Sequence, residues 1–377
     1  TNVLGSIFAA TLDDKIPELA SSRTTASVPI GGKYRIIDFD LSNMSNSGIS
    51  NVGIVAKSNF QSLMDHVGSG SAYDLSKRRS NLSILPPYDG KAFSSFVETI
   101  YNMHGYIEHC REEYVLISQG NVITNIDYTD VFDFHSKKKA DITLIYKNHA
   151  IPQGYDRPIT LDVDNDGKVN QIFVKPGVVD KEVFNHAYGS ILIKKDILMS
   201  EIRNAISVNQ LDVKRLLQSS LGKYSIYAYE NKGYCAAISS INDYFEFNMD
   251  LMKKEVRDEL FNPQRPIYTK VRDDAPSRYG LTSNVKNSII AQGCVIYGEV
   301  ENCVISKGVY VCEGAKLSNC IVMQDTKIGC TTDLDYVILD KEVTLKDGRS
   351  LMGFDSSTNY PHTLCRKGQD CRIVVPL

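Results

Sequence analysis

The sequence predicts an α/β chain in two parts: a doubly wound, mixed but mostly parallel sheet, followed by a parallel β-helix. In the first two-thirds, short runs rich in β-branched residues occur at 52–56, 114–118 and 141–146. Longer stretches separate these runs, and in one of them apolar residues return every third or fourth position, at Phe96, Ile100, Met103 and Ile107. That spacing forms one face of a helix. Strands that alternate with helices favour parallel pairing, with helices on both faces of the sheet.

One antiparallel pair is also expected in this part. The apolar runs 161–163 and 169–174 flank the sequence Asp164-Asn165-Asp166-Gly167, which is typical of a tight turn. We therefore expect a hairpin here, which makes the sheet mixed.

After about residue 250 the sequence becomes repetitive. Asn or Asp, then any residue, then two apolar β-formers return with spacings of 15, 17 and 16, at Asn287, Asn302, Asn319 and Asp335. A period of roughly 15–18 residues is about three six-residue rungs, which favours a parallel β-helix over the alternative, a β-sandwich with regular turns. Pairs such as Val304-Ile305 and Ile321-Val322 exceed what a narrow solenoid core needs. We therefore expect this part to carry subunit contacts.

These patterns divide the chain into residues 1–250, a connection at 251–283, and the repeat region 284–377. The connection reads as a helix end followed by an extended linker, because it is rich in charges and carries Pro263, Pro266 and Pro276.

Composition narrows the classes of function. The 377 residues include 42 Lys and Arg against 45 Asp and Glu, a net charge of −3, and the isoelectric point is near 6.2. With no strongly basic cluster, nucleic acid is not an expected partner. No apolar run is long enough to cross a membrane. Nine Cys without a C-x-x-C pair favour reduced thiols in a cytoplasmic protein over a disulfide framework or a zinc site.

One block of sequence carries the clearest chemical signal. Residues 30–43 read IGGKYRIIDFDLSN, and Asn46-Ser47-Gly48-Ile49 follows. The two glycines permit a tight turn, Lys33 and Arg35 supply positive charge, and Asp38 and Asn43 can hold the backbone or contact a ligand. The whole block resembles the glucose-1-phosphate adenylyltransferase (ADP-glucose pyrophosphorylase) family, and the resemblance extends over nearly the entire chain. It implies a Rossmann-like nucleotidyltransferase fold followed by a left-handed parallel β-helix.

That family joins ATP to glucose 1-phosphate and releases pyrophosphate, a reaction that depends on positioning and charge neutralisation. The resemblance implies a glycine-rich phosphate loop and two carboxylates that hold Mg²⁺. Here the loop at 9–16 has no glycine: Asp13 and Asp14 would repel a triphosphate, and Lys15 replaces the family's arginine. Asn121 and Ala237 stand at the two metal positions. We therefore expect no catalytic residues, no metal site and no cofactor in this chain.

The binding sites for anions are less clear from the sequence. Lys175 matches a family lysine that pairs with the sugar phosphate, although it could equally be a surface lysine before Pro176. Arg23, Arg35 and Lys341 match or lie near basic positions that bind phosphorylated effectors in bacterial relatives. The alternative is that Arg23 and Arg35 form structural ion pairs.

The sequence is therefore interpreted as a non-catalytic, D-type glycogen-biosynthesis subunit. We expect it to partner a catalytic ADP-glucose pyrophosphorylase subunit in a hetero-tetramer and to modulate it, with a homo-oligomer possible when alone. Two alternatives stay open. An active adenylyltransferase would need substitute carboxylates, for which Asp13, Asp14 and Glu98 are the nearby candidates. A free-standing sugar-phosphate sensor would need no partner.

Overall fold

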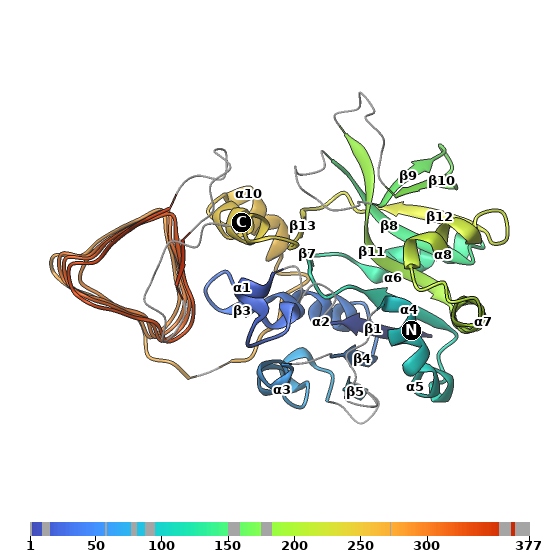
Figure 1. Cartoon of the computed structure of the whole chain (residues 1–377), viewed down its shortest axis with the longest axis horizontal. Coiled ribbons are helices and arrows are strands. Elements are labelled where there is room, and N and C mark those ends of the chain that lie inside the picture. Colours follow the sequence, from blue (N-terminus) through green and yellow to red (C-terminus); the bar gives the residue numbers. More distant parts are fainter. Residues whose placement is uncertain are drawn as a thin grey trace.

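The computed structural model describes residues 2–9, 16–56, 59–76, 81–86, 95–149, 159–174, 183–271, 273–353 and 363–365. Within these ranges the chain forms a layered α/β part and a triangular solenoid beside it (Figure 1). No helix among the described residues is both long and apolar enough to span a membrane.

The α/β part is built on one large mixed sheet. Its strands follow the order β10-β9-β11-β6-β1-β4-β5, and β8 pairs with both β11 and β12. Pairing is parallel between β1 and its neighbours β4 and β6, whereas β11 runs antiparallel to β6 and β8. The strands are β1 (Val3–Phe8), β4 (Asn51–Val55), β5 (Asn81–Leu85), β6 (Tyr114–Ser118), β8 (Ile142–His149), β9 (Ile159–Val163), β10 (Val169–Val174), β11 (Phe184–Lys194) and β12 (Ile226–Glu230).

Helices cover both faces of this sheet, which confirms the doubly wound prediction. One apolar cluster gathers side chains such as Ile100, Ile202 and Leu217, and the other gathers Leu41, Leu63 and Val131. The helices are α1 (Pro17–Ala20), α2 (Ile36–Asn46), α3 (Gln61–Val67), α4 (Phe96–Asn102), α5 (His104–His109), α6 (Tyr128–Lys137), α7 (Lys195–Ser207), α8 (Val213–Ser220), α9 (Ile241–Asp250) and α10 (Lys254–Leu260). The helical face expected from Phe96 to Ile107 is divided between two helices, α4 and α5, which meet at Met103.

The predicted hairpin is present as β9 and β10, which pair antiparallel. Its turn is held by the Asp164 carboxylate, whose Oδ1 accepts hydrogen bonds from the backbone N–H groups of Asp166 and Lys168 at 2.9 and 2.8 Å. Gly167 has φ of 86°, a left-handed conformation that favours glycine.

Two small sheets complete the α/β part. Strands β2 (Pro29–Ile30) and β3 (Tyr34–Arg35) pair antiparallel around the Gly31-Gly32 turn, and β7 (Val122–Thr124) pairs antiparallel with β13 (Cys235–Ala237). Gly32 has φ of 82°, and a Cβ there would lie 3.4 Å from the backbone oxygen of Ile305 in the solenoid. The predicted tight turn is therefore a contact point between the two parts of the chain.

The C-terminal part is a left-handed parallel β-helix, as predicted. It consists of three parallel sheets of five strands each, seen end-on as a triangle in Figure 1. The strands are β14 (Arg278–Tyr279), β15 (Asn284–Lys286), β16 (Ile289–Ile290), β17 (Val295–Ile296), β18 (Glu299–Glu301), β19 (Val304–Ile305), β20 (Tyr310–Val311), β21 (Lys316–Ser318), β22 (Ile321–Val322), β23 (Lys327–Ile328), β24 (Asp333–Asp335), β25 (Val337–Leu339), β26 (Thr344–Leu345), β27 (Ser350–Met352) and β28 (Thr363–Cys365).

Asparagines stack along one corner of this solenoid. The Nδ2 of Asn287 donates to Oδ1 of Asn302 at 2.6 Å, and that of Asn319 donates to Oδ1 of Asp335 at 2.9 Å. The register corrects one expected repeat position: Ile321 pairs with Ile338, so Tyr336 rather than Asp335 is equivalent to Asn319. Asn287, Asn302, Asn319 and Tyr336 all have positive φ, which Asn tolerates better than most residues.

The first solenoid strand begins before the expected end of the linker. Strand β14 lies inside the range 251–283 and already pairs with β17, and helix α10 also falls within that range. The domain limits at 250 and 284 stay predictions.

The apolar pairs from which subunit contacts were expected are buried within the single chain, so they offer no surface for such contacts. That the solenoid carries subunit contacts stays a prediction. Ile305 and Val322 belong to the solenoid's own core, whereas Ile321 and Ile338 belong to a cluster with Phe245 of the α/β part. These four solenoid side chains are each at most 1% exposed in the single chain. The second apolar strip therefore holds the two parts of one chain together.

The expectation of reduced cysteines is wrong for one pair. Cys312 and Cys330 form a disulfide, with their Cα atoms 4.7 Å apart. The sequence spacing gave no reason to pair them, but successive coils of the solenoid bring these positions together. Cys294, Cys303 and Cys320 are buried free thiols, as expected for core positions.

Candidate functional site

The two residues at the family's metal positions come together in the structure. Ala237 pairs with Val122 across β13 and β7, and Asn121 directly precedes β7. The Asn121 side chain donates from Nδ2 to the Ile238 carbonyl at 3.2 Å, and the Ile238 N–H donates to the Asn121 carbonyl at 2.9 Å. Asn121 is 2% exposed. Asn121 and Ala237 are 116 residues apart in the sequence (237 − 121), yet they are neighbours in the structure.

These residues do not fit a two-carboxylate Mg²⁺ site. The Oδ1 of Asn121 is buried with no hydrogen-bond partner, so one neutral oxygen is available there. Ala237 offers only a methyl group. Mg²⁺ is usually held through carboxylates and phosphates. Across the described ranges, no group of three or more His, Cys, Asp and Glu is placed to hold a metal ion.

Of the carboxylates that could substitute for the missing metal ligands, the structure describes Glu98 but not Asp13 and Asp14. Glu98 forms a capping box at the start of α4: its Oε2 accepts from the Ser95 N–H at 3.2 Å, and its own N–H donates to Ser95 Oγ at 3.1 Å. That role stabilises a helix end. Asp13 and Asp14 lie outside the described residues, as do Lys15 and Lys175.

A buried carboxyl that the sequence analysis did not single out lies beside the end of β6. Asp40 on α2 accepts a hydrogen bond from Ser118 Oγ at 2.6 Å, while its Oδ2 has no partner. Burial raises its pKa to about 7. The signal in the sequence was an acidic residue inside the apolar run Ile36–Leu41.

The polar residues Asp38 and Asn43 of the motif block have structural partners. Asp38 accepts from the Arg35 N–H at 2.8 Å, from His66 Nε2 at 2.6 Å and from the Tyr73 hydroxyl at 2.5 Å. Asn43 donates to the Thr124 carbonyl at 2.8 Å. Of the two roles expected for Asp38 and Asn43, holding the backbone is the one seen here.

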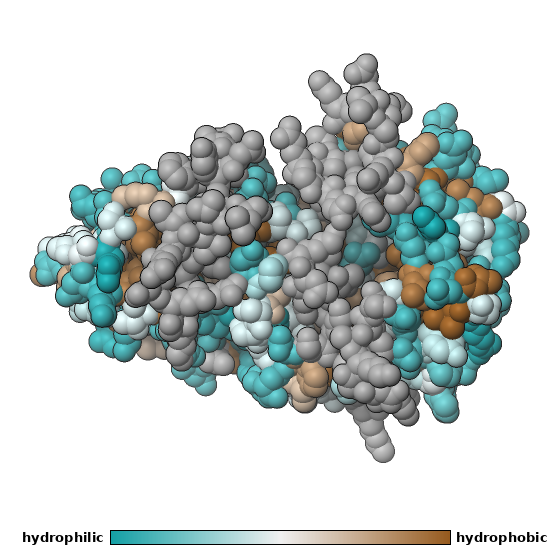
Figure 2. All heavy atoms as spheres, viewed as in Figure 1, coloured by the Kyte–Doolittle hydropathy of each residue, from teal (hydrophilic) through white to brown (hydrophobic). Residues whose placement is uncertain are grey.

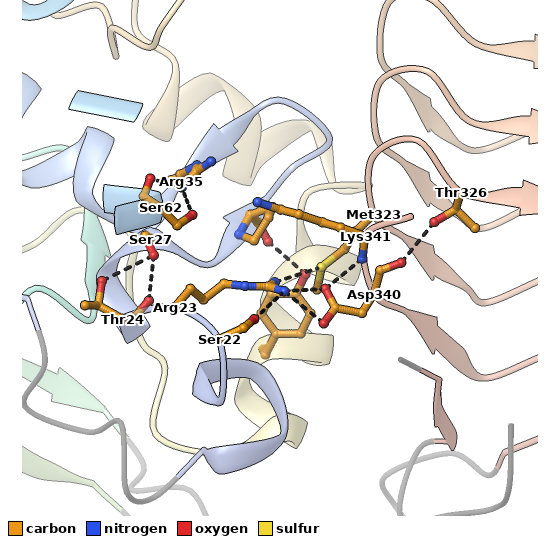
Figure 3. A network of polar contacts seen from close by, with 12 residues as sticks. Ser22, Arg23, Thr24, Ser27, Arg35, Ser62, Met323, Thr326, Asp340 and Lys341 are labelled. Atoms are coloured by element: carbon orange, nitrogen blue, oxygen red, sulfur yellow. Dashed lines mark hydrogen bonds and ion pairs between the residues drawn. The ribbon is translucent and has the colours of Figure 1, made fainter. Parts of the chain in front are cut away.

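The three basic residues expected at an effector site gather where the α/β part meets the solenoid (Figure 3). Arg23 forms a buried, two-pronged pair with Asp340, with distances of 2.7 and 2.9 Å from Nη2 to Oδ1 and Oδ2. Its Nη1 also lies 3.5 Å from the Met323 sulfur. The ion-pair alternative for Arg23 is therefore present.

Arg35 and Lys341 have different surroundings. Arg35 Nη1 donates to the carbonyl and to the Oγ of Ser62, both at 2.8 Å. Burial, followed by the charges of Arg35 and Arg23, lowers the pKa of Lys341 to about 7. Lys307 adds to this repulsion. Positive charge is thus concentrated at this junction beyond what Asp340 neutralises.

A cleft opens between the two parts beside these residues. Its walls include five groups that are cationic or can become so, namely Lys33, Arg35, His66, Lys270 and Lys307. Asp65 is the acidic residue of the lining, and Ser306 and Gln324 add polar groups from the solenoid. His66, Lys270 and Lys307 were missed by sequence reasoning, because nothing in their local sequence places them near Arg35.

The fold and these positions define a class. A family model described as "Nucleotidyl transferase" matches residues 14–254, more than half of the chain, and one described as "GlmU-like, C-terminal hexapeptide" matches residues 270–366. The chain therefore belongs to the nucleotidyl transferase family.

Individual relatives are more specific. The chain is 32% identical over 347 residues to "Glycogen biosynthesis protein GlgD" of Bacillus subtilis, covering 91% of this chain and 90% of the relative. It is 32% identical over 338 residues to a "Glucose-1-phosphate adenylyltransferase" of Clostridium perfringens, covering 86% and 84%. A protein of the same name from Acetivibrio thermocellus is 31% identical over 99% of this chain and 88% of its own length.

Proposed function

We propose that this chain is a non-catalytic subunit of an ADP-glucose pyrophosphorylase, acting in glycogen biosynthesis by modulating a catalytic relative. The observation that carries the proposal is the pair Asn121 and Ala237. Ala237 lies on β13 and Asn121 directly precedes the neighbouring strand β7, where the family resemblance requires metal carboxylates, and together they offer one neutral oxygen. A phosphoryl group needs its charge neutralised while it is transferred, so the lack of carboxylates for Mg²⁺ supports a chain that does not form ADP-glucose.

The expected partner is a glucose-1-phosphate adenylyltransferase subunit, in a hetero-tetramer. Support comes from the relatives, whose names describe both a glycogen-biosynthesis protein and the adenylyltransferases themselves. A chain that keeps this fold without the metal-binding carboxylates can still use its surface to assemble with other subunits. Such a subunit changes the activity of its partner only if it binds the active and inactive forms with different affinity.

Effector binding is assigned to the junction between the two parts. Arg35, Lys341 and the cationic cleft beside them would attract a phosphorylated sugar, and Arg23 would fix the solenoid through Asp340. A bound dianion would relieve the mutual repulsion of these cations. It would thereby change the junction that joins the α/β part to the solenoid.

The experiment is co-expression with the catalytic relative from the same source, followed by purification through a tag on this chain alone. We expect co-purification, no ADP-glucose formation by this chain, and a changed maximal rate or effector midpoint in the mixture. The matched control is heat-inactivated chain at equal concentration, which separates regulation from simple protection. Kinetics equal to those of the catalytic subunit alone would contradict the proposal. Tight sugar-phosphate binding by the isolated chain without any assembly would favour a sensor instead.

A further inference from the structure

A second hollow in the α/β part lies apart from both sites described above. It has a volume of about 700 Å³, within the range of small-molecule sites. It opens beside the end of β12, between α6 and the β9–β10 turn, the hairpin visible next to β12 in Figure 1. Its lining contains neither the metal-position residues nor the basic residues of the junction.

The walls of this hollow are fixed by specific contacts. The N–H of Ala228 donates to the Gly167 carbonyl at 2.8 Å, which ties the hairpin turn to the edge of β12. Lys138 on α6 pairs with Asp166 of the same turn at 2.5 Å. A Cβ at Gly167 would lie 3.1 Å from the Phe134 ring, so the absence of a side chain allows this close approach. The hollow is thus preformed by a strand, a helix and a turn.

Three aromatic rings contribute to its surface. Phe134, Tyr146 and Tyr229 line it, and all three are only partly buried. Phe134 and Tyr229 pack edge to face, with ring centroids 5.6 Å apart. Burial, with Glu230 near one hydroxyl, raises the pKa of Tyr146, and burial with Asp130 and Asp127 raises that of Tyr229. Both hydroxyls therefore keep their protons and remain hydrogen-bond donors.

The charged groups of the lining disfavour an anion. Four carboxylates and two lysines line the hollow: Asp127, Asp164, Asp166, Glu230, Lys138 and Lys232. Asp127 is paired with Arg265, and Asp166 with Lys138. What remains for a ligand is chiefly the acceptor Glu230, the donor Lys232 and the tyrosine hydroxyls. The lining therefore offers no excess of positive charge that would attract a phosphate group.

Flat apolar rings beside carboxylate acceptors and hydroxyl donors match the chemistry of an uncharged sugar. Its C–H faces can pack on aromatic rings, while its hydroxyls both donate and accept hydrogen bonds. We propose that this hollow binds a neutral saccharide, with Tyr229 as the stacking ring and Glu230 as an acceptor for sugar hydroxyls. This site is separate from the junction proposed for phosphorylated effectors and does not depend on that proposal.

The test is calorimetric titration of the purified full chain with glucose, maltotriose, glucose 1-phosphate and spermine. Maltotriose should bind, and Tyr229→Ala should weaken that binding about fivefold or more, since a ring contact and its buried area are lost. Tyr229→Phe, which keeps the ring, should retain most of the affinity. Glu230→Gln changes an exposed side chain, tests the acceptor independently of folding, and should weaken binding less than loss of the ring. The matched control is Tyr310→Ala, which removes a part-exposed tyrosine of the solenoid.

Three outcomes would overturn the proposal. The first is no binding of maltotriose at millimolar concentration. The second is binding of maltotriose to the Tyr229→Ala and Glu230→Gln variants that is as tight as to the unmodified chain. The third is a glucose 1-phosphate or spermine signal that Tyr229→Ala abolishes while maltotriose gives none, which would assign the hollow to a charged ligand.

Discussion

Two pairs of residues from distant parts of the sequence meet in this chain, and their chemistry is opposite. Asn121, just before β7, and Ala237 on β13 meet where the family resemblance calls for carboxylates, and neither carries a charge. Arg23 and Asp340 meet across the junction with the solenoid, both charged and both buried. The chain thus keeps buried charge where two parts of the fold are joined and lacks it where phosphoryl transfer would need it. This contrast supports the proposed non-catalytic role.

The largest predicted effect concerns the catalytic rate, and catalysis by this chain would contradict the contrast. We expect ADP-glucose formation by the isolated chain to fall about 10³-fold or more below that of a catalytic relative, because the charge-neutralising groups are missing. The double change Asn121→Asp with Ala237→Asp should not restore it, since Asp13 and Asp14 would still repel ATP. Pyrophosphate release is the measurement, with the unmodified chain as control. Substantial recovery would show that two carboxylates were the whole deficit.

The next largest predicted effect is on the stability of the junction between the α/β part and the solenoid. Asp340→Ala should lower the free energy of unfolding by about 3–5 kcal/mol, because it leaves Arg23 buried without its counter-charge. The side chains of Arg23 and Asp340 are 6% and 11% exposed. The control is Glu299→Ala, which removes a 3.8 Å pair with Lys316 on the solenoid surface and should cost about 0–1 kcal/mol.

Urea unfolding monitored by circular dichroism measures both variants. Replacing both partners, Arg23→Met with Asp340→Leu, should recover much of the loss, because no unpaired charge remains buried. Equal stability of Asp340→Ala and the unmodified chain would mean that the pair does not hold the junction.

Regulation gives a smaller effect. Arg35→Ala should change the response of the mixed enzyme to sugar phosphates by a factor of about 5–150, the usual range of coupling between sites, and should leave assembly intact. Arg35 lines the cleft, and its Nη1 donates to Ser62 Oγ at 2.8 Å. Lys316→Ala, on the solenoid surface, is the control. An unchanged effector curve for Arg35→Ala would remove the junction from the proposed effector site.

How far the sequence could predict these regions depends on the range of the interactions. The strand–helix alternation and the repeat near Asn302 are local patterns, so both parts of the fold followed from them. That Asn121 and Ala237 lie close together followed from their motif positions. Asp340 as the partner of Arg23 could not be predicted, because the two lie 317 residues apart and only tertiary packing joins them.

The apolar pairs of the solenoid show a second limit. Periodicity correctly marked Ile321 and Val322 as buried, but it cannot say against what. The structure places Val322 in the solenoid core and Ile321 against the α/β part. Composition likewise could not show that Cys312 and Cys330 face each other on successive coils.

At the junction between the α/β part and the solenoid, Lys341 gives the smallest predicted effect, a pH dependence of anion binding. Its pKa is lowered from 10.5 to about 7 by burial and by Arg35, Arg23 and Lys307, against the opposing effect of Asp340. Between these two pKa values the unfolded chain binds more protons than the folded one, so this group makes stability rise with pH. Its charged form is therefore disfavoured at the junction until an anion neutralises the surrounding cations. Because an anion favours the protonated amine, binding should be tighter at pH 6 than at pH 8, by about tenfold.

Sulfate is the probe for this prediction, since it stays a dianion over that range and only groups on the protein titrate. Titration calorimetry at the two pH values measures the ratio, and Lys341→Met should remove most of it while raising stability more at pH 6 than at pH 9. His66 lines the same cleft, and burial lowers its pKa, so His66→Gln separates its contribution from that of Lys341. If sulfate binds equally at pH 6 and pH 8, or if Lys341→Met keeps the full pH dependence, Lys341 does not contribute its charge to the junction.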